Sequence, residues 1–213
     1  MLPYFKQWQI APFNPETWQR EPYRTDHPVN QVIQNWFEDC SSVLDVGCGS
    51  CPDVTLFQTD YYGVDVTPKF VQTAYNHHKV SDLFIGSVLN LPFHMNSFEG
   101  VYCKDLLEHL PPDTWRQAVS EMIRVANRKV LFVFFKTFGE ECYVQEEKIG
   151  FYHRPTDRLY DFGFWCNRYN YDEFMDYLKT FNVKKIHSRF GVRDDTNIKS
   201  KSKDIIRVLL KVK

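Results

Sequence analysis

The pattern of apolar segments in the 213 residues predicts an α/β fold built on a doubly wound, mostly parallel sheet. Strand-like and helix-like segments alternate from residue 28 to residue 180, which is typical of a parallel sheet with helices on both faces. The apolar run 130–135 suits a strand that is buried on both faces. Two strand-like segments, 183–190 and 204–212, then follow with no helix between them. They predict a hairpin, and therefore an antiparallel edge strand on a seven-stranded sheet.

The first part of the chain begins with a segment of irregular composition. Residues 1–27 are rich in aromatic residues, Pro and Gln, and we expect them to form an N-terminal cap segment over the core. Apolar residues at helical spacing predict a helix over 28–39, and an apolar strand over 42–46 follows it. A helix is predicted over 67–78, with Thr67 as its N-cap and a proline in its first turn.

The second part of the chain holds the clearest helix and the least regular segment. Five apolar residues form one stripe over 113–126, and a further helix is predicted over 171–180 behind a capping Asn170. Residues 136–169 do not fit the alternation and are rich in aromatic residues. We expect a lid insert at about 139–168, above the carboxyl ends of the strands, where ligands bind in such sheets. The plainer interpretation is a satellite hydrophobic cluster.

Composition limits the class of protein. The length suits one main domain, 28–213, and the formal net charge of −1 gives no global attraction to nucleic acid or anionic lipid. No apolar run is long enough to span a bilayer, and the N-terminus has no signal-peptide pattern, which favours a cytoplasmic location. Of the six cysteines, Cys48 and Cys51 are interpreted as free thiols of the glycine loop, because this pair lacks the further ligands of a metal site.

The segment 42–50 ends an apolar strand in an acidic residue and a Gly-x-Gly turn. Such a turn lets the backbone approach a nucleotide-like ligand. Asp45 lies two residues before Gly47, where its carboxylate would repel a pyrophosphate and attract an ammonium or sulfonium group. Pro52 occupies the place of the third glycine of the dinucleotide fingerprint. The pattern therefore indicates a positively charged nucleoside ligand, and S-adenosylmethionine is the obvious candidate.

Later segments support a nucleoside site. Asp65 ends a second strand-like segment twenty residues after Asp45, where a carboxylate can accept both ribose hydroxyls. Leu-Pro-Phe at 91–93, Phe-Glu-Gly-Val at 98–101 and Leu-Glu-His-Leu at 107–110 follow in order. Over roughly residues 40–180 the chain resembles the class I S-adenosylmethionine-dependent methyltransferases, in particular the type 11 group that acts on small molecules.

The resemblance implies a Rossmann-like fold, S-adenosylmethionine as cofactor, and O- or N-methylation of a small-molecule acceptor. The sequence departs from the family at Cys51, where a third glycine is common, and at Ser87, where many members have an acidic residue. Two alternatives stay open: a non-catalytic S-adenosylmethionine-binding or scaffold module, and an RNA- or DNA-modifying methyltransferase. The residues expected to bind the cofactor are Asp45, Gly47, Cys48, Gly49, Asp65, Val66, Ser87, Val88, Leu89 and Lys104.

Methyl transfer from a sulfonium is an in-line displacement, so the protein mainly aligns donor and acceptor and excludes water. A base is needed only where the acceptor must lose a proton. The candidates for catalysis are His109, His153 and Tyr160. Each has a plainer interpretation, since His109 can stabilise a helix start and His153 can lie on the surface. The segment 104–107 also lacks the Asn-Pro-Pro-Tyr turn of enzymes that methylate the amino groups of DNA bases.

Overall fold

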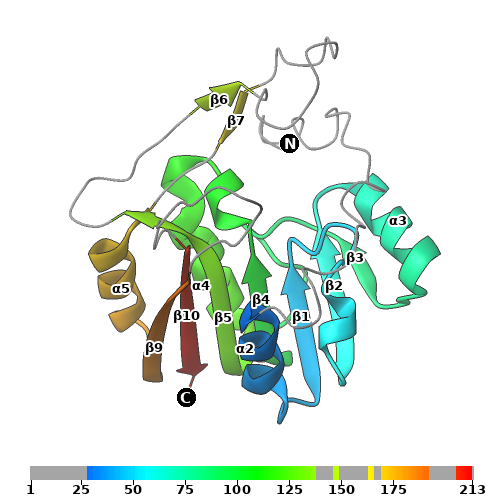
Figure 1. Cartoon of the computed structure of the whole chain (residues 1–213), viewed down its shortest axis with the longest axis horizontal. Coiled ribbons are helices and arrows are strands. Elements are labelled where there is room, and N and C mark those ends of the chain that lie inside the picture. The colour runs from blue at the N-terminus through cyan, green and yellow to red at the C-terminus, as the bar shows by residue number, and fades with distance from the viewer. Residues whose placement is uncertain (1–27, 138–145, 149–162, 166–168, 192–204, 213) are drawn as a thin grey trace.

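The computed structural model describes residues 28–137, 146–148, 163–165, 169–191 and 205–212. Within these residues the main sheet has the strand order β3-β2-β1-β4-β5-β10-β9, and a short strand, β8, pairs with β5 (Figure 1). The predicted mostly parallel α/β sheet with seven main strands is confirmed, and β8 adds a short eighth strand beside β5. Its strands are β1 (Ser42–Val46), β2 (Asp60–Asp65), β3 (Leu83–Ile85), β4 (Phe98–Lys104), β5 (Ala126–Thr137), β8 (Tyr169–Asn170), β9 (Val183–Gly191) and β10 (Ile205–Val212).

Helices cover both faces of this sheet. In Figure 1, α2 lies in front of the sheet and α4 lies behind it. Along β5, Val130 and Phe132 pack in the same cluster as α4 and α5, whereas Leu131 and Val133 pack with α2. This alternation explains the continuous apolar run, because the strand has no solvent-facing side. The helices are α2 (Pro28–Phe37), α3 (Pro68–His78), α4 (Trp115–Val125) and α5 (Tyr171–Lys179), with 3₁₀ turns η2 (Val54–Leu56), η3 (Leu107–His109) and η4 (Pro112–Thr114).

The last two strands complete one side of the sheet. β10 is antiparallel to β5 on one side and to β9 on the other. The expected antiparallel pairing at this end of the sheet is confirmed. The antiparallel strand itself lies one position in from the edge, and β9 forms the edge.

Local structure agrees with most of the expected elements and differs at several ends. The α5 N-cap is confirmed, because Asn170 Oδ1 accepts from the Glu173 N–H at 3.0 Å. At α3, Thr67 holds the N-cap position without a side-chain capping bond. β5 starts at Ala126, four residues before the apolar run, directly after α4.

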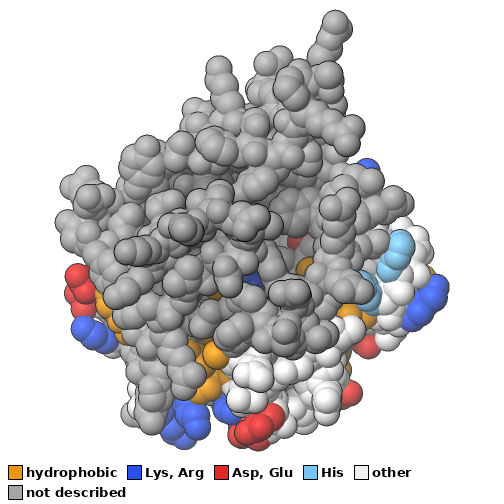
Figure 2. Space-filling model, viewed as in Figure 1, with side chains coloured by type: hydrophobic (Ala, Val, Ile, Leu, Met, Phe, Trp, Pro, Cys, Tyr) orange, Lys and Arg blue, Asp and Glu red, His pale blue; other side chains and the backbone are white. Residues whose placement is uncertain are grey.

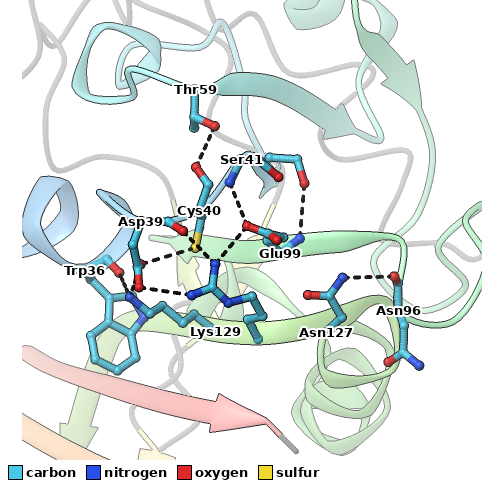
Figure 3. Close-up of polar contacts among 11 residues, drawn as sticks. Trp36, Asp39, Cys40, Ser41, Thr59, Asn96, Glu99, Asn127 and Lys129 are labelled. Carbon is cyan, nitrogen blue, oxygen red and sulfur yellow. Dashed lines mark hydrogen bonds and ion pairs between the residues drawn. The ribbon is translucent and has the colours of Figure 1, made fainter.

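A network of charged side chains joins the amino ends of β1, β4 and β5 (Figure 3). Asp39, just after α2, pairs with Arg128 and Lys129 of β5. Glu99 of β4 pairs with Arg128 at 2.9 Å and accepts from the Ser41 N–H at 2.7 Å. These contacts connect three strands and α2 at the end of the sheet opposite the carboxyl ends.

The segment predicted to be a lid is described only in part. β6 (Glu146–Lys148) and β7 (Gly163–Trp165) form an antiparallel pair that lies beyond the carboxyl ends of β1 and β4 (Figure 1). β7 approaches η3. The remainder of 139–168 and the predicted cap segment 1–27 lie outside the described residues. No described helix is long and apolar enough to cross a membrane.

Candidate active site

The turn after β1 has the backbone conformation that the glycine pattern predicts. Gly47 and Gly49 have φ values of +75° and +53°, in the left-handed region that glycine adopts without strain. The Gly47 N–H donates to the Val64 carbonyl of β2 at 2.8 Å, which fixes the start of the turn. A Cβ added at Gly49 would meet no heavy atom within 4 Å. The turn therefore leaves open space beside its backbone.

Asp65, the last residue of β2, holds this turn in place. Its two carboxylate oxygens accept from the Gly49 N–H at 2.9 Å and from the Thr67 N–H at 2.8 Å. Burial raises the pKa of this carboxyl, while the backbone bonds from Thr67 and Gly49 act in the opposite direction. A carboxylate has about four acceptor positions, so these two bonds leave room for two further donors. A pair of ribose hydroxyls matches that remaining capacity.

A cleft opens beside the turn and joins both halves of the predicted site. Five residues expected from the sequence line it, and so do five that were not predicted. The lining consists of Val46, Gly47, Val64, Asp65, Val66, Gly86, Val88, Leu106, His109 and Leu110. His109 lies on η3, which follows β4, so the candidate base faces the same cleft as the turn.

Of the three residues predicted after β3, only Val88 lines the cleft. Leu89 is buried in the core cluster around α4. Ser87 pairs with Asn90 in an isolated bridge, and its hydroxyl accepts from the Leu89 N–H at 3.1 Å. Ser87 thus shapes the turn that carries Val88.

Asp45 lies beneath the turn and outside the cleft lining. It is 4% exposed, and its Oδ2 accepts from the Tyr61 hydroxyl at 2.7 Å. Burial, followed by the negative charge of Asp53, raises the pKa of Asp45 to about 7. When ionised, this buried carboxylate therefore places a negative charge directly beneath the turn.

Lys104, the last residue of β4, forms an ion pair with Asp53 in the loop after the glycine turn. The Tyr102 hydroxyl donates to the same Asp53 oxygen at 2.8 Å. Asp53 could not be identified from the sequence, because its partners lie about fifty residues away and meet it only through the order of the strands. Lys104 does not line the cleft.

Cys48 and Cys51 are free and buried within the turn. Contact with the Cys51 thiol, and then burial, raises the pKa of the Cys48 thiol well above its usual range. No group of three or more His, Cys, Asp or Glu side chains is placed to hold a metal ion in the described part of the chain. Cys51 has a φ of +57°, so it adopts the conformation that a glycine would take in this turn.

The conformation of Cys51 predicts an unusual order of stability. We expect Cys51→Gly to be more stable than Cys51→Ala by roughly 1 kcal/mol, because only glycine avoids the left-handed strain. Both variants lose the sulfur atom, so their difference isolates the backbone. Urea unfolding of the two variants measures it. The control is Ala118→Gly in the interior of α4, which should instead lose about 1 kcal/mol. An alanine variant as stable as the glycine variant would contradict the expectation.

Two of the candidate catalytic residues belong to the predicted lid. His153 and Tyr160 lie outside the described residues. The cleft residues that were not predicted are small or apolar: Val46 and Val64 end or lie within strands, Gly86 follows β3, and Leu106 and Leu110 lie on either side of His109. Leu106 and Leu110 are part of the motif around His109, so their helical spacing was the available signal.

A glycine turn after β1, an acidic residue at the end of β2 and a cleft at the carboxyl ends of the strands are typical of the fold of class I S-adenosylmethionine-dependent methyltransferases. Residues 44–134 match the model of the family described as "Methyltransferase domain". Residues 44–134 of the chain therefore carry a methyltransferase domain. A comparison of the sequence with curated proteins finds no match.

Solved structures share the fold at low sequence identity. The PH0226 protein of Pyrococcus horikoshii OT3 is 16% identical, with a TM-score of 0.64 over 87% of this chain and 88% of that chain. The 1,6-didemethyltoxoflavin-N1-methyltransferase of Burkholderia thailandensis is 13% identical, with a TM-score of 0.66 over 98% and 85%. The magnesium protoporphyrin IX methyltransferase of Synechocystis PCC 6803 is 13% identical, with a TM-score of 0.65 over 100% and 99%.

Proposed function

We propose that this methyltransferase acts on an oxygen or nitrogen atom of a small-molecule acceptor. The observation that carries the proposal is that the turn, Asp65 and His109 all line the same cleft. Two of the solved structures with this fold are, by their names, a 1,6-didemethyltoxoflavin-N1-methyltransferase and a magnesium protoporphyrin IX methyltransferase. Val46, Val64, Val88, Leu106 and Leu110 give this cleft mostly apolar walls, which suit acceptors of that kind.

The cofactor fits the residues of the turn. The open space at Gly49 lets a ligand approach the backbone of the turn closely. The remaining acceptor positions of Asp65 suit the ribose hydroxyls. Val66 and Val88 offer apolar contact for the adenine ring, and Asp45 supplies negative charge beneath the turn. When bound, the sulfonium supplies an electrophilic methyl group.

The acceptor side is formed by η3 and by the segment above it. Leu106 and Leu110 exclude water, and His109 is the group that would take a proton from an acceptor hydroxyl or amine. We place the lid at about 139–168 and the cap segment at 1–27, with His153 and Tyr160 contributing to the acceptor pocket. The β6–β7 pair near η3 supports this placement of the lid.

Nucleic-acid modification is the alternative acceptor class. Figure 2 shows positive and negative side chains interspersed on the described part of the visible face. The ammonium of Lys104 is neutralised by Asp53. Nucleic-acid binding depends on an array of cations that contacts phosphates, so these observations favour the small-molecule acceptor.

Release of S-adenosylhomocysteine from S-adenosylmethionine tests the proposal. The purified protein is incubated with a panel of phenols, amines and heterocycles and, separately, with a mixed RNA preparation. Turnover with members of the small-molecule panel is the expected result. Turnover with RNA alone would replace the proposal with the alternative acceptor class, and binding of the cofactor without any turnover would favour the scaffold interpretation.

The role of His109 predicts a selective loss of turnover. With an acceptor that must lose a proton, His109→Ala should lower kcat by about 100-fold or more while the affinity for S-adenosylhomocysteine stays within about twofold. Steady-state kinetics and calorimetry measure the two quantities. The matched control is His94→Ala, which removes an exposed imidazole outside the cleft lining. An unchanged kcat and pH–rate profile would assign His109 a structural role at the start of η3.

A further inference from the structure

A buried group of charged and hydroxyl side chains lies beneath the glycine turn. It contains two carboxylates, each with its own partners. Asp45 accepts a hydrogen bond from Tyr61. Asp53 accepts one from Tyr102 and forms an ion pair with Lys104. Asp45 and Asp53 are 4% and 3% exposed. The group joins β1, β2 and β4 to the loop that follows the turn.

The charges of this group do not balance. Two carboxylates face one ammonium, and Asp53 Oδ1 is buried with no hydrogen-bond partner among the described residues. A surplus charge in a buried site is costly unless a counter-charge approaches it. When Asp45 is ionised, the group therefore favours the approach of a cation at the turn.

Other ionisable groups face Asp45 from the surrounding elements. Asp65 at the end of β2 adds negative charge. Burial raises the pKa values of Tyr61, Tyr102 and Cys103 well above their usual range, and thiol contact and burial do so for Cys48, so these four groups stay neutral near pH 7. Among the described residues, Lys104 is the cation that acts on Asp45, and it opposes the effect of Asp53.

We propose that Lys104 and Asp53 are positioning residues of the cofactor site, which hold the loop after the glycine turn and set the negative charge that Asp45 presents to the amino group of the cofactor. The inference rests on the proposed placement of the cofactor at this turn. Lys104 ends β4, directly before the segment that carries Leu106 and His109. One ion pair thus links the cofactor half of the cleft to the acceptor half.

The proposal gives cofactor binding a defined pH dependence. The pKa of Asp45 is raised to about 7, so below that pH the carboxyl is protonated and attracts a cation weakly. Affinity for S-adenosylhomocysteine, whose amino group is protonated near neutral pH, should therefore rise as pH increases through about 7 and level off above it. Binding below the midpoint should release a proton, because the cation favours the ionised carboxyl.

Calorimetry of the parent protein between about pH 6 and pH 8.5, in buffers of different ionisation enthalpy, measures both the midpoint and the proton release. Methylthioadenosine is the control ligand, since it keeps the nucleoside and lacks the amino-acid group. Its affinity should be independent of pH over the same range. Equal pH dependence of the two ligands, or none for S-adenosylhomocysteine, would overturn the inference.

Two variants that break the ion pair between Lys104 and Asp53 distinguish an effect of charge on cofactor binding from an effect of lost structure. Asp53→Asn should lower the pH midpoint, because it removes a negative charge near Asp45, and Lys104→Met should raise it, because it removes the cation. Each shift should be on the order of one pH unit. Asp176→Asn and Lys179→Met break an exposed ion pair of α5 and should leave the midpoint unchanged.

The outcomes distinguish the inference from the proposed function. Loss of affinity in both variants at an unchanged midpoint would mean that the ion pair has a structural role only. Lys104→Arg, which keeps the charge, should restore the parent midpoint. If the parent protein binds S-adenosylhomocysteine at no pH, the placement of the cofactor fails, and this inference fails with it. If either variant does not fold, the inference is still overturned when the parent protein binds S-adenosylhomocysteine with no pH dependence.

Discussion

Asp65→Ala is expected to lower the affinity for S-adenosylhomocysteine by about 100-fold or more, as measured by calorimetry. The variant removes the acceptor of two ribose hydroxyls, and each charge-assisted hydrogen bond contributes roughly 1.5–3 kcal/mol. It also leaves the Gly49 and Thr67 N–H groups without their acceptor, so the turn loses its support.

Two companion variants sharpen this result. Asp65→Asn keeps one side-chain carbonyl acceptor and should fall between the parent protein and the alanine variant. Asp60→Ala removes an exposed carboxylate at the other end of the same strand and should bind as the parent does. Parent-like affinity in Asp65→Ala would show that the cofactor does not occupy this part of the cleft.

Gly47→Val is expected to abolish measurable cofactor binding in a protein that remains folded. The φ of +75° is strained for any other residue and most of all for a β-branched one. A Cβ at this position would also lie 2.9 Å from Leu106 Cδ2, in the wall of the cleft. Circular dichroism establishes folding, and calorimetry with S-adenosylhomocysteine measures binding.

The cause of that loss can be resolved with two further proteins. Adding Leu106→Ala to Gly47→Val removes the close contact but leaves the strained backbone, so binding should stay weak if the conformation of the turn decides it. Gly49→Ala meets no atom within 4 Å and should lose less, since only its φ of +53° is unfavourable. Normal affinity in a folded Gly47→Val protein would mean that another segment binds the cofactor.

The fold could be predicted from the sequence wherever burial places apolar residues at a regular spacing or in a continuous run. The apolar stripe of α4 and the apolar run of β5 both follow from packing on the central sheet. The start of β5 was missed because Arg128 and Lys129 are polar and read as a connection. They belong to the strand because Asp39 and Glu99 satisfy their charges at the amino end of the sheet (Figure 3). Tertiary contacts of this kind leave no periodic signal.

The candidate site divides in the same way. The turn glycines and Asp65 were predictable because their conformations and bonds are set within one strand–turn–strand unit. The ion pair between Asp53 and Lys104 was not, because it depends on β4 lying next to β1. The sequence predicts Lys104 as a cofactor ligand, which stays a prediction, and the structure shows its ion pair with Asp53 in the loop that follows the turn.

The position of β10 has a consequence for how the chain assembles. β9 pairs with β10 and with no other described strand, and β10 fills the place beside β5. During synthesis on the ribosome, β5 and β9 therefore emerge before the strand that separates them. Until β10 arrives, the outer edge of β5 is an unpaired apolar strand, which is the kind of surface that aggregates or recruits chaperones. Pairing of β9 with β5 at that stage would occupy the place of β10, so the native strand order requires this edge of β5 to stay available until β10 is synthesised.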